Sequence, residues 1–200
     1  MNKTSSRVAR DAEAAALDAA VRAALDAGDA RGAVALLAGG LGAPVLRYCR
    51  RLVGDDTLAE DVRQSVFVTV AERLAHLPRR SSLRAWVFAV AHNRCLDVLK
   101  SARRFDTRFA LPGELPEHLA DASPSAADRL DARAVHRALA RALAAMAPPV
   151  RTALRLRYEE ELSYEEMARI CGERAGTLQA RIARTLPLLR RCVDPASSRE

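Results

Sequence analysis

The sequence is poor in aromatic residues, which make up only 4% of its 200 positions. A core built from this chain must therefore consist mainly of alanine, leucine and valine, residues whose side chains suit closely packed helices. Half of the residues are apolar, which is enough to form a buried core. This composition excludes a chain that is disordered throughout. These proportions predict an all-α fold.

Cysteine is also scarce, and its spacing fits no disulfide scaffold or CxxC pair. The sequence has four, at Cys49, Cys95, Cys171 and Cys192. His92 and Cys95 stand three positions apart and could form half of a zinc site, but no second pair lies near them in sequence, and a closed site needs four ligands. We therefore predict reduced thiols, no metal and no cofactor.

Segments that would direct the chain to or through a membrane are missing as well. Residues Met1 to Leu17 mix charges of both signs and contain no apolar core of a signal peptide. The longest apolar stretch, Ala33 to Leu46, is interrupted by three glycines and a proline, so we do not expect it to span a membrane. The prediction is a cytoplasmic protein without membrane insertion.

Motifs for catalysis are absent: the sequence shows no Ser/His/Asp arrangement, no phosphate-binding Walker loop and no GxGxxG. We therefore predict that the chain is not an enzyme. Its formal charge is +7, from 32 basic and 25 acidic residues. This balance favours a polyanionic partner such as nucleic acid, although a GC-rich coding bias explains the excess of arginine equally well.

Changes in composition divide the chain into five segments. Residues 1–29 are predicted to form an N-terminal extension whose helix ends at Gly28. Residues 30–104 are predicted to form a first domain. Residues 105–128 are rich in proline and acids and read as a linker. Residues 129–193 form a second domain, and residues 194–200 a tail. The architecture predicted is two small helical domains joined by a Pro-rich linker.

Within the first domain, glycines at 39, 40 and 42 are expected to interrupt a helix, which resumes from Pro44 to Val53 and stops at Gly54. Asp55 or Asp56 can cap the next helix. Its buried stripe is predicted from apolar residues at every fourth position, namely Leu58, Val62, Val66, Val70 and Leu74. Ser81 or Ser82 can then cap a helix from Leu83 to about Arg104.

The second domain carries the strongest local signal, a predicted helix-turn-helix. Ser163 and Glu166 fit a capping box at the start of one short helix, and Gly172 allows the turn before the next. That next helix has one side that can pack, with Leu178, Ile182, Thr185, Leu186 and Leu189. The other side is basic with small residues between, and carries Ala180, Ala183, Arg184, Pro187 and Arg191. Such a side can approach a DNA groove, but an ordinary solvated helix has the same pattern.

Two separated motifs together resemble the group IV, or extracytoplasmic-function (ECF), sigma factors of the sigma-70 family. The first comprises AEDVRQSVF at 59–67 and LRAWVFAVAHNRCLD at 83–97, and is similar to sigma region 2. The second comprises LSYEEMA at 162–168 and GTLQAR at 176–181, and is similar to region 4. The resemblance implies a sigma factor that binds core RNA polymerase and directs transcription initiation at promoter DNA. It also implies an anti-sigma protein as regulator, for which the N-terminal helix is a candidate docking element.

The resemblance assigns roles position by position. It implies polymerase binding by Asp61, Gln64 and Phe67. It implies contacts with the −10 element by Arg79, Arg80, Trp86, Phe88, Asn93, Arg103 and Arg104, where Trp86 and Phe88 could be platforms for unstacked bases. For Trp86 the favoured interpretation is instead a core anchor. Contacts with the −35 element are implied for Arg174, Thr177, Gln179, Arg181, Arg184 and Arg191.

Several positions depart from the family pattern. Ser65 stands where an acid is usual, Gln179 and Ala180 replace a basic residue and a serine, and Pro187 lies inside the reading helix, where it should kink the helix or remove a hydrogen bond. Two alternatives remain open from the residues alone. One is a stand-alone helix-turn-helix transcription regulator, and the other is a helical adaptor with an incidentally basic surface.

Overall fold

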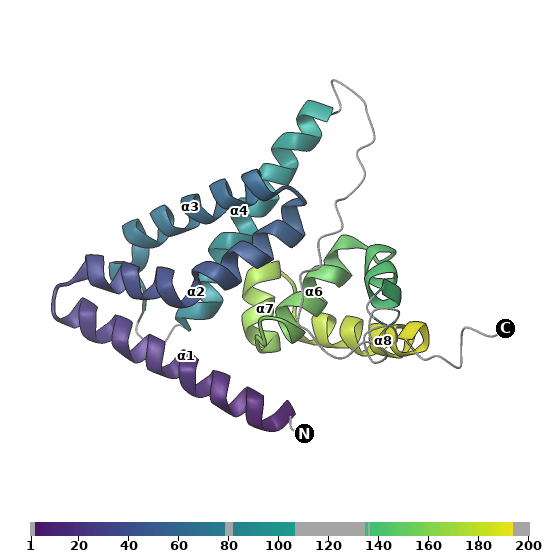
Figure 1. The fold of residues 1–200 in the computed structure, drawn as a ribbon, viewed down its shortest axis with the longest axis horizontal. Coiled ribbons are helices and arrows are strands. Elements are labelled where there is room, and N and C mark those ends of the chain that lie inside the picture. The colour runs from purple at the N-terminus through teal and green to yellow at the C-terminus, as the bar shows by residue number, and fades with distance from the viewer. Residues whose placement is uncertain (1–2, 79–81, 107–134, 136, 194–200) are drawn as a thin grey trace, which may run out of the picture. The chain divides into compact units, whose positions relative to one another are not determined.

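Every regular element in the described part of the chain is a helix, which confirms the all-α prediction (Figure 1). The computed structural model describes residues 3–78, 82–106, 135 and 137–193. They belong to two compact units, Met1–Pro116 and Glu117–Glu200. Most of the predicted linker and the tail lie outside the described residues, so the boundaries of the five predicted segments remain predictions.

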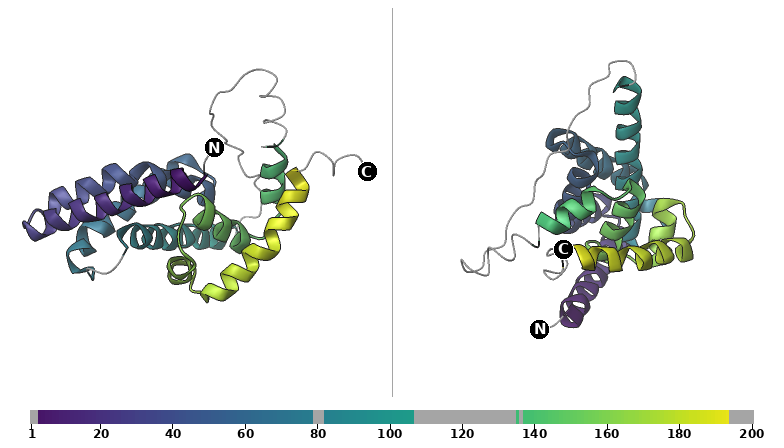
Figure 2. Two further views of the ribbon diagram at one scale, coloured as in Figure 1. Left: turned by 90° about the horizontal axis from the view of Figure 1, so that it is seen from below. Right: turned by 90° about the vertical axis from the view of Figure 1, so that its right-hand side faces the viewer.

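The N-terminal unit is a bundle centred on one helix. It contains α1 (Lys3–Asp26), α2 (Ala30–Val53), α3 (Asp56–Arg73), a short 3-10 helix η1 (Leu74–His76) and α4 (Leu83–Asp106). Helices α1 and α2 lie side by side as an antiparallel hairpin (Figures 1 and 2). Since α2 packs against α1, α3 and α4, it forms the centre of this unit.

Helix α2 runs without interruption through Gly39, Gly40, Gly42 and Pro44, so the predicted break at the glycines is wrong. A Cβ atom on Gly40 would come within 2.7 Å of a Leu17 methyl group. The absence of a side chain at this position therefore lets α1 lie close against α2. Each glycine lowers helix propensity by about 1 kcal/mol relative to alanine, and packing on both sides of α2 outweighs that cost.

An unbroken α2 also changes the argument about membranes. By length and composition alone, α2 is apolar enough to cross a bilayer. Because α2 is continuous, the predicted break no longer excludes a membrane-spanning helix. Its apolar character has another explanation, because Leu37, Val45 and Tyr48 are buried in the bundle. A helix that is covered on several sides in a helical core needs apolar residues for that reason.

The helix termini follow local sequence signals. Asp55 accepts a hydrogen bond from the Leu58 amide at 2.7 Å and is the N-cap of α3. Ser82 accepts one from the Ala85 amide at 3.2 Å at the start of α4. Gly54 ends α2 in the left-handed conformation, with φ 80°, where glycine has no steric penalty. The predicted caps at Asp55 and Ser82 are confirmed.

A polar pair and an aromatic contact join α2 to α4 in the core of the N-terminal unit. Tyr48 Oη and His92 Nδ1 form a buried hydrogen bond of 2.9 Å. The Tyr48 ring also meets Phe88 edge to face, with ring centroids 5.5 Å apart, a favoured geometry for aromatic pairs. Burial lowers the pKa of His92, because removal from water disfavours the charged imidazolium.

The C-terminal unit is a compact helical domain (Figure 2). Residues 135 and 137–144 are helical, and are followed by α6 (Pro148–Tyr158), α7 (Tyr164–Cys171) and α8 (Ala175–Val193). Helix α8 packs against both α6 and α7. The core that joins them contains the fully buried Leu156, Met167, Leu178 and Ile182.

Candidate functional site

The outer face of α3 exposes two of the three residues predicted to bind polymerase. Asp61 and Gln64 are exposed, whereas Phe67 is half-buried at the edge of this face. Val68 lies seven positions after Asp61, so it shares that face, and 58% of its surface is exposed. The sequence prediction did not include Val68. Its exposure could have been predicted from the helical repeat, because Val68 lies between the buried positions Val66 and Val70 and therefore on the opposite side of the helix.

Leu58 belongs to the same exposed surface, at 42% exposure, which corrects its assignment to the buried stripe. Val62, Val66, Val70 and Leu74 are buried as predicted. With 3.6 residues per turn, each four-residue step rotates by about 40°, so the two ends of the predicted stripe differ by about 160°. The N-terminal end of the stripe has therefore turned to solvent. Beside this face, Arg63 forms an ion pair with Glu60, which lowers the pKa of Glu60 and raises that of Arg63.

The residues of α4 that were predicted to contact the −10 element differ in their exposure to solvent. Asn93 is exposed and Trp86 is half-buried. They lie seven positions apart on one face, about 10 Å along the helix axis. Phe88 is fully buried against Tyr48, and the Arg84 guanidinium lies 5.2 Å from its ring centroid. Its predicted role as a base platform is therefore corrected, because no face of the ring is open to a base.

Four arginines predicted near the −10 element cannot be placed. Arg79 and Arg80 lie outside the described residues, and so do the side chains of Arg103 and Arg104. A basic residue that the prediction did not include, Arg94, is exposed one position after Asn93. Its guanidinium donates a 3.0 Å hydrogen bond to the Thr69 hydroxyl on α3, so it joins α4 to α3.

The helix-turn-helix forms as the sequence predicted. Ser163 and Glu166 make the reciprocal bonds of a capping box, at 2.8 and 3.2 Å. Gly172 ends α7 with φ 66°, a left-handed conformation that glycine adopts without strain. The Arg174 carbonyl accepts from the amides of Thr177 and Leu178, so α8 begins directly after this turn.

Helix α8 has one buried and one free side. Four residues of the predicted packing side are buried, and Leu186 is half-buried; the buried ones are Leu178, Ile182, Thr185 and Leu189. Most residues predicted to contact the −35 element are exposed: Arg174, Thr177, Gln179, Arg184 and Arg191. The free side is therefore largely the one that the sequence predicted.

Arg181 differs from the other arginines of α8. It is partly buried and forms two bonds with the Glu173 carboxylate, Nη1 to Oε1 at 2.7 Å and Nη2 to Oε2 at 2.5 Å. The hydrogen bond with Arg181 lowers the pKa of Glu173, and the same bond raises the pKa of Arg181. Glu173 is not among the residues predicted from the sequence, because a pair eight positions apart across a turn has no helical periodicity.

Pro187 does not end α8, which continues to Val193. Proline has no amide hydrogen, so the helix lacks one internal hydrogen bond at this position, as predicted. Pro187 and the neighbouring Leu188 are both exposed, so the proline ring faces away from the domain core.

The cysteines and histidines of the described residues form no metal centre: no group of three or more His, Cys, Asp or Glu side chains gathers there. His92 already bonds to Tyr48 through Nδ1. The thiols of Cys49 and Cys95 are fully buried. A hydrogen bond with Cys49, together with burial, raises the pKa of Cys95, so the Cys95 thiol stays protonated at neutral pH.

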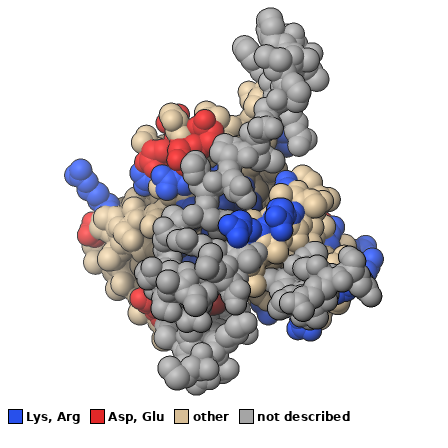
Figure 3. Space-filling view, turned by 45° about the vertical axis from the view of Figure 1, so that its right-hand side comes forward, with Lys and Arg blue, Asp and Glu red and all other residues tan. Residues whose placement is uncertain are grey.

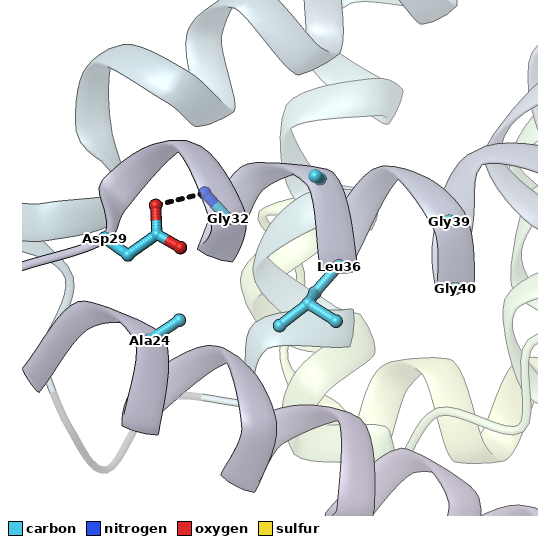
Figure 4. A pocket seen from close by; sticks show the side chains of 7 residues that line it. Ala24, Asp29, Gly32, Leu36, Gly39 and Gly40 are labelled. Carbon is cyan, nitrogen blue, oxygen red and sulfur yellow. Dashed lines mark hydrogen bonds between the residues drawn. The ribbon is translucent and has the colours of Figure 1, made fainter. Parts of the chain in front are cut away.

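Surface charge by itself does not define a nucleic-acid interface. On the face shown in Figure 3, Lys and Arg side chains stand in several separate groups, and acidic side chains gather mainly in one patch. An open apolar groove near the α1–α2 turn is lined by Ala24, Leu36 and glycines (Figure 4). Asp29, also in its lining, is occupied as the N-cap of α2 through the Gly32 amide. The only charged side chain in the groove is thus used in capping α2, and the free helix faces are the better candidates.

Comparison with known proteins identifies the family to which both units belong. The family model of sigma-70 region 2 matches residues 40–105, and that of sigma-70 region 4 matches residues 136–187. The chain is 31% identical over 134 residues to the ECF RNA polymerase sigma factor RpoE of Cereibacter sphaeroides, covering 66% of this chain and 70% of the relative. It is 29% identical over 137 residues to the ECF RNA polymerase sigma factor SigC of Mycobacterium tuberculosis, covering 68% and 71%.

Two solved structures share the fold. The sigma factor RpoE in complex with the anti-sigma factor NepR from Bartonella quintana matches with a TM-score of 0.62 and 21% identity, over 75% of this chain and 89% of that one. CnrH in complex with the cytosolic domain of CnrY matches with a TM-score of 0.58 and 22% identity, over 86% and 94%. The chain belongs to the ECF sigma factors of the sigma-70 family. It is thus a promoter-recognising factor for transcription initiation.

Proposed function

We propose that this chain binds core RNA polymerase through α3, contacts the −10 element through α4 and reads the −35 element through α8. One observation carries the proposal. Both sigma regions fold as units of the same chain. In each unit, one side of a helix from the matched region is polar and is not covered by the rest of its domain. A stand-alone regulator would need only the second unit.

The polymerase contact is assigned to the exposed face of α3 with Asp61, Gln64 and Val68. Polar side chains beside exposed apolar ones are typical of protein–protein interfaces. Here Leu58 and Val68 supply apolar surface on the same helix as the polar pair. Phe67, at the edge of the face, can add contact area without leaving its half-buried position.

The −10 contact is assigned to the face of α4 that carries Trp86 and Asn93. Single-stranded bases stack on aromatic rings and form hydrogen bonds with amide side chains. Trp86 is partly exposed, so one part of its indole can stack while the rest packs in the domain. Arg79, Arg80, Arg103 and Arg104 remain proposed phosphate contacts on the basis of sequence.

The −35 contact is assigned to the free side of α8. Arg184 and Arg191 lie seven positions apart and are both exposed, so they can reach bases or phosphates along a duplex groove. Thr177 and Arg174 stand at the helix N-terminus, which favours phosphate. Gln179 lies at the edge of this side and can hydrogen-bond to a base edge.

Partners and location follow from this function. The chemistry of RNA synthesis belongs to the polymerase, so this chain is a specificity subunit and not an enzyme, and it acts in the cytoplasm where polymerase works. One structural neighbour is a sigma factor in complex with an anti-sigma factor, and the other is in complex with the cytosolic domain of CnrY. We therefore propose that an anti-sigma protein regulates this chain too, with α1 as its docking element.

The test is transcription in vitro on fragmented genomic DNA, with core polymerase in the presence and absence of this protein, followed by mapping of RNA 5′ ends. We expect new start sites that share upstream motifs. Asp61→Lys should reduce them by impairing polymerase binding, while Glu13→Lys, an equal charge reversal at an exposed position of α1, should not. Specific binding to a duplex operator without polymerase, with no new start sites, would contradict the proposal and identify a stand-alone regulator.

A further inference from the structure

The turn of the helix-turn-helix is joined to the reading helix by one ion pair. Glu173 stands between α7 and α8, directly after Gly172, and Arg181 lies on the second turn of α8. The Glu173 and Arg181 side chains are only 29% and 25% exposed. Both carboxylate oxygens accept from the guanidinium, so the contact has the two-pronged geometry that holds an arginine in one orientation.

This pairing separates Arg181 from the other cations of α8. Arg184 and Arg191 are exposed, and neither forms an ion pair with any acid in the described part of the chain. Arg181 lies between the free side and the buried side, since Leu178 and Ile182 next to it are buried. Glu173 therefore holds the guanidinium at the edge of the surface that would face DNA.

A bidentate partner determines what an arginine can do at a DNA surface. A guanidinium whose two Nη groups both bond to a carboxylate is held in that orientation with two of its five N–H donors engaged, and the paired charges nearly cancel at a distance. The same interaction connects two backbone segments, because Glu173 precedes α8 and Arg181 lies inside it. Disrupting the pair would free one positive charge and release α8 from the turn.

Building on the proposed −35 function of α8, we propose that Glu173 is a positioning residue for promoter recognition: it holds Arg181 off the DNA and fixes the start of α8 against the turn. The −35 element is then bound by Arg184, Arg191 and the N-terminal residues of α8. Arg181 contributes to the orientation of the helix and does not itself bind phosphate.

The salt dependence of promoter binding by the full chain with core polymerase tests this inference. The probe is a promoter fragment from the start-site mapping described above. When a substitution removes one cation that binds a phosphate, the slope of log K against log salt becomes shallower by about 0.9. We expect Arg181→Gln to leave the slope unchanged. Arg184→Gln, the matched control on the same helix, should make the slope shallower by about 0.9.

The Glu173→Gln variant gives the complementary result. It frees Arg181, so the slope should become steeper by up to about 0.9 as the released cation finds a phosphate. Discrimination among promoters with single changes in the −35 element should decrease, because α8 is no longer held at the turn. In Glu173→Gln/Arg181→Gln the steeper slope should disappear. The charge swap Glu173→Arg/Arg181→Glu should restore discrimination.

Two outcomes overturn the inference. A slope shallower by about 0.9 in Arg181→Gln would show that this arginine binds phosphate despite Glu173. Unchanged slope and discrimination in Glu173→Gln, with the variant folded by circular dichroism, would show that the pair positions nothing. In either case the wild-type holoenzyme still binds its promoter, so the proposed function stands. If the wild-type holoenzyme forms no promoter complex, both fail.

Discussion

The buried hydrogen bond between Tyr48 and His92 should stabilise the N-terminal unit, and Tyr48→Phe isolates its contribution. The hydroxyl and Nδ1 are 2.9 Å apart, and both residues are buried, with exposures of 1% and 7%. The substitution removes the hydroxyl and keeps the ring that packs edge to face on Phe88. His92 would then be without a polar partner where water has little access.

The expected size follows from this burial. Leaving a buried polar group without its partner costs about 1–3 kcal/mol, so we expect the free energy of unfolding to decrease by that amount. Tyr48→Ala removes the ring as well and leaves a cavity, which costs about 3–5 kcal/mol for a large aromatic side chain. The difference between the two variants measures the packing of the ring on Phe88 and its surroundings.

The assay is urea unfolding of the full chain, followed by the fluorescence of its single tryptophan, Trp86. Because Trp86 lies in α4, the signal reports on the N-terminal unit. Tyr158→Phe is the matched control: Tyr158 is 52% exposed and lies in the other unit, so its substitution should leave the transition unchanged. A decrease below about 0.5 kcal/mol for Tyr48→Phe, outside the range for removal of a buried partner, would show that this hydrogen bond does not stabilise the unit.

Two further predictions concern titratable groups. Burial lowers the pKa of His92 below its usual 6.5, so the unfolded chain binds a proton before the folded one does as pH falls. The free energy of unfolding of the N-terminal unit should therefore decrease as pH falls below about 6.5, which urea titrations from pH 7.5 to 5 can measure. His92→Gln should remove this pH dependence. His76→Gln, at an exposed position, should keep it. Among the described cysteines, Cys171 should be alkylated first, because Cys49 and Cys95 are fully buried. Burial, with a smaller effect of a nearby glutamate, raises the pKa of Cys171 to about 11, so its alkylation rate should increase about tenfold per pH unit between 8 and 10. Peptide mapping by mass spectrometry can follow this rate. Equal alkylation rates for the three cysteines would contradict the burial pattern.

Local signals in the sequence were sufficient for the helix termini and for the family. The Ser163–Glu166 capping box, the Asp55 cap and the glycine turn at Gly172 all form as predicted. Each depends on hydrogen bonds or backbone angles within a few residues, so the sequence contains the whole interaction. The two faces of α8 were also predictable, because a helix repeats every 3.6 residues.

Where prediction failed, contacts between distant segments decided the outcome. Glycine has a low helix propensity, which predicted a break in α2. Gly40 instead makes room for Leu17 of α1, and packing keeps the helix continuous. Leu58 fits a four-residue repeat, but the repeat drifts around the helix and turns Leu58 to solvent. Neither result can be read from a single segment, since propensity and periodicity describe a helix without its neighbours.

The fold class, the family and the helices proposed to carry the functional faces could all be predicted from the residues alone. Which residues on those helices are exposed depends on the tertiary structure. Phe88 and Trp86 lie two positions apart on α4, yet Phe88 is enclosed by Tyr48 from α2 and Trp86 remains partly exposed. Arg181 and Arg184 lie one turn apart on α8, yet only Arg181 meets the carboxylate of Glu173. Chemically similar side chains differ in role because burial and pairing depend on residues that the chain brings together from elsewhere.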